Sequence, residues 1–506
     1  MKTTRRKLRA LGFVMTLTVC AFLLLAMPPL HGQEAVAPPS KVERKNKAPV
    51  SRDVLSIKLP KPIEATLKNG LTVLILEDRR APYVSMQLYI GGAGALFEPI
   101  GTAGLANATA TMLTEGTQSR SSVQIAEQID RLGAGISAAS SFGSPDTILS
   151  ASGLSDNFDE WFSVFIDVLL HPSFPAGELE KLKQRQRVHL REQRSSSGFL
   201  TNERFNRAVY GDHPAGQVSA SLESIDKLDR ETLTRWHRDR YAPGNAILGI
   251  AGDVRGKDLI AKLERRLAAW KKPEVKQTWP RNPTAQTARK VFLVNRPNSV
   301  QTTLALGNIA IDRRSADYMA MVVMNHVIGG GASSRLFLNL REEKGYTYGV
   351  YSDFSALRFP GPWRAGGSMR TEVTEGALTE FFNEFQRIRD EKVAAAELEA
   401  SKRAIIASFA LSLEQPTRVL GFAITSKQYG FPADYWDSYA VRIMAVSADD
   451  VQRVARKYLD PDALQVVAVG DASKIKSFLE KYGAVEVSDA SGAPLAGQNH
   501  SPTIRH

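Results

Sequence analysis

The sequence predicts an α+β protein of two tandem, duplicated domains, each a largely antiparallel sheet with helices packed on one face. Three observations lead to this prediction. The chain has 506 residues, about two to three times the length of a typical domain. Two distant passages share one layout of helix, proline and strand. Short strands and long helices do not alternate strictly, as they would in a doubly wound parallel sheet.

The internal repeat is visible at two places in each half. An apolar strand that follows a helix and a proline ends at Gly252, and an equivalent strand ends at Gly470. Two charged helices begin with the same Glu-Leu-Glu triplet, around Leu179 and Leu398, at nearly the same offset. A period this long indicates tandem domains rather than a solenoid. The predicted domains are 57–275 and 284–485, with a boundary near 272–283.

Within the halves, hydrophobic periodicity predicts the individual elements. Val84, Met86, Leu88 and Ile90 alternate with polar residues, which is typical of a half-buried strand. Helical patterns are predicted over 101–114, 155–169, 177–194, 316–328, 375–388 and 395–412.

The two ends of the chain predict export and flexibility. A basic start, the apolar run Ala10–Met27 and a following proline pair predict an export signal over 1–32, and hence a periplasmic or otherwise exported protein. If the signal is uncleaved, its apolar run is just long enough to anchor the chain in a membrane. Residues 33–56, rich in proline and charge, predict a linker, and 486–506 predict a disordered tail.

Composition excludes several functional classes. Cys20 is the only cysteine and lies in the predicted signal, so disulfides, thiolate metal sites and a cysteine nucleophile are excluded. Of the net charge of +12, +5 comes from the first nine residues and +2 from residues 34–56. The remaining +5 is a solvated surface, so no nucleic-acid partner is expected.

The stretch 104–117 resembles the active-site helix of the pitrilysin family, the inverted-motif zinc peptidases that include insulin-degrading enzyme and the mitochondrial processing peptidase. That family has His-x-x-Glu-His where this chain has Asn107, Ala110 and Thr111. Two histidines four residues apart on a helix face the same way and hold one zinc, while the glutamate deprotonates the bound water. An amide, a methyl group and a hydroxyl cannot take these roles, so we expect no metal bound by this chain and no catalytic residue of its own.

The resemblance also implies a third ligand, a glutamate on a later long helix. Aligning the Glu-Leu-Glu triplet with the start of that helix places His189 at the ligand position and Leu182 at a supporting acidic position. An alignment shifted by three residues would place Glu192 there instead. His189 is interpreted either as a replacement ligand or as a solvated helix residue.

A second motif, 334–348, resembles the most recognisable segment of the family's C-terminal domain. There an arginine and a tyrosine seven residues later contact the substrate backbone beside the zinc of the opposite domain, and Arg341 and Tyr348 match them. A guanidinium donates hydrogen bonds to peptide carbonyls, and a phenol stabilises a developing oxyanion. The alternative is structural: Arg341 pairs with an acidic neighbour and Tyr348 fills the following strand.

Loss of the zinc motif beside a retained substrate motif resembles the non-catalytic subunits of heterodimeric family members. The leading hypothesis is therefore an exported subunit that joins a homologous, zinc-bearing partner to degrade or process peptides, with the zinc on that partner. One alternative is a peptide-binding or structural scaffold with no part in catalysis. Another is a stand-alone metallopeptidase with an altered site.

Overall fold

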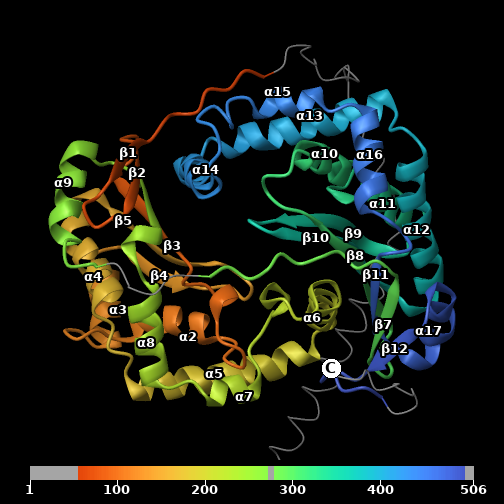
Figure 1. Cartoon of the computed structure of the whole chain (residues 1–506), viewed down its shortest axis with the longest axis horizontal. Coiled ribbons are helices and arrows are strands. Elements are labelled where there is room, and N and C mark those ends of the chain that lie inside the picture. The colour runs from red at the N-terminus through yellow and green to blue at the C-terminus, as the bar shows by residue number, and fades with distance from the viewer. Residues whose placement is uncertain (1–54, 272–277, 496–506) are drawn as a thin grey trace, which may run out of the picture. The chain divides into compact units, whose positions relative to one another are not determined.

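The computed structural model describes residues 55–271 and 278–495. They lie in one compact unit that begins at Val54. The unit contains two six-stranded sheets, one on each side of residues 272–277 in the sequence (Figure 1). The predicted α+β class with two duplicated, largely antiparallel sheets is confirmed.

The first sheet has the strand order β1-β2-β6-β3-β5-β4, and only its β2–β6 pair is parallel. Its strands are β1 (Ile63–Thr66), β2 (Thr72–Glu77), β3 (Tyr83–Gly91), β4 (Gly135–Ala139), β5 (Asp146–Leu154) and β6 (Ala246–Gly252). Its half also contains α2 (Leu105–Met112), α3 (Ser122–Arg131), α4 (Phe158–Leu170), α5 (Ala176–Ser195), α6 (Ser197–Tyr210), α7 (Leu222–Asp226), α8 (Arg230–Arg240) and α9 (Gly256–Arg266). The alternation in β3 holds as predicted, because Val84, Met86, Leu88 and Ile90 are all buried.

The second sheet has the order β12-β7-β11-β8-β10-β9, with β7 parallel to both β11 and β12. Its strands are β7 (Lys290–Asn295), β8 (Gln301–Ile311), β9 (Thr347–Ala356), β10 (Pro360–Arg370), β11 (Gln465–Gly470) and β12 (Val485–Ser488). Its helices are α10 (Tyr318–Gly329), α11 (Arg335–Phe337), α12 (Thr374–Asp390), α13 (Ala395–Ser412), α14 (Pro416–Tyr429), α15 (Tyr439–Ala445), α16 (Ala448–Tyr458) and α17 (Ala472–Leu479). A π-helical turn, Leu338–Glu343, follows α11.

The sequence repeat corresponds to a structural repeat. The order β2-β6-β3-β5-β4 in the first sheet matches β7-β11-β8-β10-β9 in the second. The helices α5 and α6 correspond to α13 and α14, and both pairs of starting residues are separated by the offset of the Glu-Leu-Glu triplets. The six predicted helices are all present, with ends that differ by a few residues.

The two halves exchange one helix each. The helix α6 packs on β8 and β11 of the second sheet, where Phe205 lies over Gly307. The helix α14 packs on β2 and β6 of the first sheet, where Ile424 lies over Gly249. A Cβ atom on Gly307 would stand 2.1 Å from the Trp363 carbonyl oxygen and 2.9 Å from Phe205. One on Gly249 would stand 2.7 Å from Ile424. A glycine in each strand therefore leaves room for these contacts. Each sheet is therefore covered partly by the other half.

The predicted disordered tail begins too early. Residues 485–488 form β12, an edge strand parallel to β7, with Val485 buried. The chain then turns back along β12, and the Leu495 N–H donates to the Val487 carbonyl at 3.1 Å. Alternating Val485 and Val487 provide the strand pattern, which the Gly, Ser and Ala that follow obscured in the sequence.

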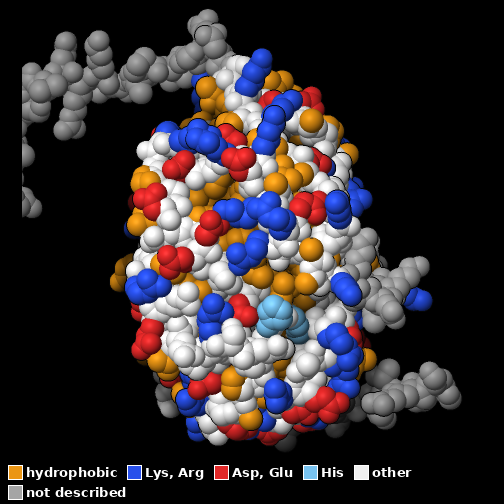
Figure 2. All heavy atoms as spheres, turned by 90° about the vertical axis from the view of Figure 1, so that its left-hand side faces the viewer, with side chains coloured by type: hydrophobic (Ala, Val, Ile, Leu, Met, Phe, Trp, Pro, Cys, Tyr) orange, Lys and Arg blue, Asp and Glu red, His pale blue; other side chains and the backbone are white. Residues whose placement is uncertain are grey.

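The predicted signal, 1–32, and nearly all of the predicted linker, 33–56, lie outside the described residues. Export therefore stays a prediction, as do the limits of the sequence repeat at 57–275 and 284–485. None of the helices in the described ranges is long and apolar enough to cross a membrane. Basic and acidic side chains are interspersed on the face of the first half shown in Figure 2.

Candidate functional site

The helix that carries the altered motif, α2, begins against a buried carboxylate. Gly104 adopts the left-handed conformation with φ of 98°, which allows the chain to turn into the helix. The two carboxylate oxygens of Glu98 accept hydrogen bonds from the Gly104 N–H at 3.0 Å and the Ala106 N–H at 2.7 Å. Burial nevertheless raises the pKa of Glu98 to about 7, since desolvation outweighs these two donors.

The raised pKa of Glu98 predicts a pH-dependent stability. The folded chain holds this proton more tightly than the unfolded chain, where the pKa has its ordinary value of 4.5. The stabilisation from Glu98 is therefore complete below pH 4.5 and is lost as the pH rises through 7. We expect Glu98→Gln to remove this dependence, so that between pH 5 and 8 the parent loses about 2 kcal/mol relative to the variant. Urea unfolding of both proteins at the two pH values measures the difference, and parallel pH profiles would contradict the assignment.

The altered motif residues are held by hydrogen bonds between neutral groups. The Asn107 Nδ2 donates to the Ser140 carbonyl, just after β4, at 3.1 Å. The Gln186 Nε2 on α5 donates to the Asn107 Oδ1 at 3.5 Å. Ala110 is fully buried, and Thr111 is partly buried. A hydrogen bond between two side-chain amides thus links α2 to α5 where the family resemblance implies a shared zinc ion.

The structure corrects the position assigned to His189. Gln186, not His189, faces Asn107. His189 lies three residues farther along α5, about 4.5 Å along the helix axis. There its side chain is 68% exposed, and its Nδ1 lies 3.9 Å from the Glu192 carboxylate. Glu192, the alternative ligand, is 71% exposed.

The register of α5 is fixed by its buried residues. Leu179 and Leu182 are buried, so Leu182 belongs to the core and not to a polar shell around a site. The ammonium of Lys183 donates to the carbonyls of Asp226 at 3.2 Å and Leu228 at 3.1 Å. One turn later, Gln186 continues this inward face. The inward positions 179, 182, 183 and 186 form a helical period that was available in the sequence.

These residues do not fit a zinc ion. Zinc in proteins takes imidazole, thiolate or carboxylate ligands, and the facing residues Asn107, Thr111 and Gln186 are all neutral. Within residues 55–271 and 278–495, no group of three or more His, Cys, Asp or Glu side chains could hold a metal ion. The fully buried methyl group of Ala110 also leaves no base on this face of α2.

The predicted substrate residues lie around the start of β9. The Arg341 guanidinium lies 4.7 Å from the centre of the Phe337 ring and 3.6 Å from the Glu342 carboxylate. Thr347 is buried and donates to the Ser368 carbonyl at 2.6 Å, which fixes the first residue of the strand. The next side chain, Tyr348, is 91% exposed. Arg341 thus lies near an acidic neighbour, and Tyr348 lies in the strand that follows, where its phenol makes no hydrogen bond within the described residues.

Each half of the chain matches a known family model. Residues 72–218 match the family "Insulinase (Peptidase family M16)", and residues 227–405 match "Peptidase M16 inactive domain". The chain belongs to the M16 peptidase family. The resemblance seen in the altered helix motif and in the segment around Arg341 is thereby confirmed.

Two bacterial relatives match this chain over most of their own length. A protein named uncharacterized zinc protease YmxG from Bacillus subtilis is 26% identical over 352 residues, covering 69% of this chain and 84% of the relative. An uncharacterized zinc protease from Rickettsia bellii is 25% identical and covers 79% of this chain and 92% of the relative.

Two solved structures agree in fold with this chain. The M16 inactive-domain protein from Pseudomonas fluorescens is 27% identical, with a TM-score of 0.75, and covers 81% of this chain and 98% of that one. A protease from Helicobacter pylori is 19% identical, with a TM-score of 0.74 over 81% of this chain and all of that chain. The second likeness concerns the fold alone.

Proposed function

We propose that this M16 protein is the non-catalytic subunit of an exported, heterodimeric zinc peptidase. One observation carries the proposal. The side chains that meet between α2 and α5 are the neutral amides of Asn107 and Gln186, whereas Tyr348 is 91% exposed. Such a chain cannot bind zinc through these residues, but it has a phenol that is free to contact a substrate. This combination is expected of a subunit that assists catalysis by a zinc-bearing partner.

The proposed contribution of this chain is to bind and orient the peptide. The guanidinium of Arg341 donates to carbonyl oxygens of the substrate backbone, and its packing on Phe337 limits its motion. The phenol of Tyr348 would donate a hydrogen bond to the oxyanion that develops on the scissile peptide group during cleavage. The zinc and the base belong to the homologous partner subunit.

The competing proposal is a scaffold that binds peptides or partner chains without acting in catalysis. The hydrogen bonds of Asn107 support this scaffold equally well. They account for the absence of a zinc motif whether or not a zinc-bearing partner exists. The exposure of Tyr348 favours the heterodimer, since a large aromatic side chain without packing neighbours stabilises no fold of its own.

Two measurements on the purified mature chain test the proposal. Alone, it is expected to contain no stoichiometric zinc and to cleave no peptide. Mixed with a zinc-bearing M16 relative from the same organism, it should form a heterodimer with far more activity than either subunit. One tightly held zinc per chain with chelator-sensitive hydrolysis would refute the non-catalytic role. Full activity of the partner alone would refute the catalytic contribution of this chain and favour the scaffold proposal.

A further inference from the structure

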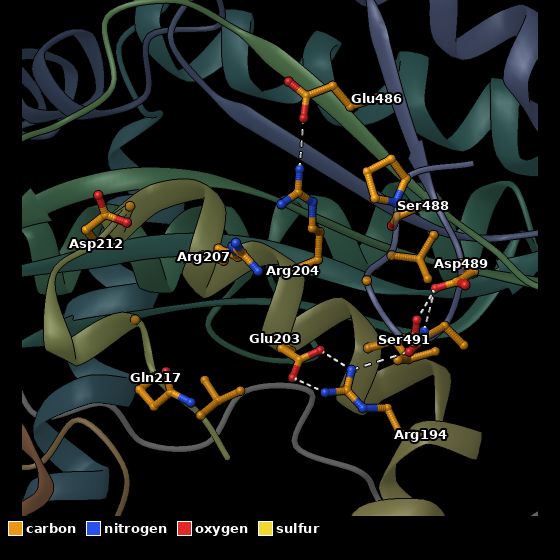
Figure 3. Close-up of a pocket in the computed structure, with 18 of the residues that line it drawn as sticks. Arg194, Glu203, Arg204, Arg207, Asp212, Gln217, Glu486, Ser488, Asp489 and Ser491 are labelled. Carbon is orange, nitrogen blue, oxygen red and sulfur yellow. Dashed lines mark hydrogen bonds and ion pairs between the residues drawn. The ribbon is translucent and has the colours of Figure 1, made fainter. Parts of the chain in front are cut away.

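A cavity of about 930 Å³ lies outside the altered zinc position. It is enclosed by α6, by the loop 211–218 and by residues 486–494 at and beyond β12 (Figure 3). Its size is near the upper end of the ~300–1,000 Å³ typical of ligand pockets. The predicted function assigns no role to this cavity.

Two of the three arginines that line the cavity have carboxylate partners. Arg194 forms a two-pronged pair with Glu203, with one contact at 2.7 Å. Arg204 donates to Glu486 at 3.0 Å, and its guanidinium lies 3.9 Å from the centre of the Phe292 ring. These two arginines are fixed in place by ion pairs and by stacking.

The third arginine, Arg207, has no counterion in the described part of the chain. It lies one turn after Arg204 on α6, and Figure 3 shows both side chains projecting from the same helix. Like charges three residues apart on a helix repel one another. Burial and, to a smaller extent, the charge of Arg207 lower the pKa of Arg204, against the opposing charge of Glu486. The Arg204 guanidinium is thus paired with Glu486, whereas the Arg207 guanidinium has no ion-pair partner among the described residues and could take a carboxylate of a ligand.

The other walls of the cavity are suited to more than a small anion. Leu200, Val294 and Val487 line it, and Ile100 at its edge is completely exposed. Leu200 and Val294 are already buried, so the apolar surface open to a ligand is that of Val487 and Ile100. A small inorganic anion would leave this surface in water, whereas peptide side chains would cover it. Asp212, also unpaired among the described residues, is an acceptor for peptide N–H groups or an ammonium group.

We propose that this cavity binds an extended peptide segment through a carboxylate held by Arg207 together with Arg204. Arginine is suited to this task because its planar fork forms two parallel hydrogen bonds with a carboxylate. The apolar walls accept the neighbouring side chains of the peptide. The proposal requires neither a partner subunit nor a metal ion, so it stands or falls separately from the proposed function.

Calorimetric titration of the mature chain tests the proposal. The probes are the peptide acetyl-Leu-Glu-Ala-Leu-amide, the same peptide with Gln in place of Glu, and inorganic phosphate. We expect the Glu peptide to bind at least tenfold more tightly than the Gln peptide and than phosphate, and to weaken with added salt. Equal binding of the two peptides, or no saturable binding at millimolar concentrations, would overturn the carboxylate site. Phosphate binding as tight as that of the peptide would overturn the peptide class.

The matched variants are Arg207→Gln and Arg191→Gln. Both side chains are exposed and both substitutions remove one positive charge, but Arg191 does not line the cavity. Arg207→Gln should weaken binding of the Glu peptide about tenfold and leave the melting temperature unchanged. Arg191→Gln should change neither. Equal losses of peptide affinity in both variants would show that only the net charge matters, and would contradict the assignment of the carboxylate to Arg207.

Discussion

The combined substitutions Asn107→His, Thr111→His and Gln186→Glu are expected to create a site for one zinc ion per chain. Side chains at positions 107 and 111 are four residues apart on α2 and face the same way. The Gln186 amide already lies 3.5 Å from the Asn107 oxygen, so a carboxylate at this position faces the two imidazoles. Three ligands of the preferred type should raise zinc affinity by about four orders of magnitude or more over the parent chain. Metal analysis after dialysis against a weak chelator measures it.

The control for this variant uses the other register of α5. Asn107→His and Thr111→His are combined with His189→Glu, while Gln186 is kept, so the introduced ligand types are the same. Because position 189 is exposed and farther along the helix, only the two imidazoles should bind, and the zinc should be lost on dialysis. Equal zinc retention in both variants would show that α5 does not present position 186 to α2. Neither variant should hydrolyse peptides, because Ala110 supplies no base.

The sequence predicted the fold well where the evidence was local or was repeated in both halves. Alternation in β3 is a local periodicity and the two Glu-Leu-Glu helix starts belong to the internal repeat, and both appear in the structure. The exchange of α6 and α14 could not be predicted in this way. It depends on which sheet a helix meets, and the pairing of Phe205 with Gly307 is visible only once the chain is folded. An apolar face on a helix indicates burial but not the partner that buries it.

The sequence predicted the part of the candidate site that lies on one helix, but not the residue that faces it from a distant helix. Asn107, Ala110 and Thr111 lie within five residues of one another, so their shared face follows from helix geometry. The position opposite them lies on α5, far along the chain from Thr111, and a sequence alignment without a fixed register could shift it by three residues. Leu182 and Lys183 fix that register through burial and through the hydrogen bonds of the Lys183 ammonium. The resulting error assigned His189 instead of Gln186.

Tyr348→Phe is expected to lower the turnover of the proposed heterodimer by roughly a hundredfold to a thousandfold, the typical cost of removing one oxyanion donor. The side chain is 91% exposed and makes no hydrogen bond within the described residues, so the fold should be unaffected. Arg341→Ala removes hydrogen bonds made in both the ground and transition states, and should raise KM with a smaller effect on kcat. The measurement is turnover per intact heterodimer, with the melting temperature taken on the same sample.

Tyr351→Phe is the matched control, because Tyr351 lies on the same strand, is 50% exposed and has an aromatic contact with Phe337 at 5.6 Å. It removes the same hydroxyl from another tyrosine of β9, and its heterodimer should turn over normally. A purely structural role for Tyr348 predicts a different pattern: impaired pairing or a lower melting temperature, with normal turnover in the complex that still forms. Normal turnover in an intact Tyr348→Phe heterodimer would show that this chain does not take part in catalysis, because Tyr348 is the one oxyanion donor proposed for it.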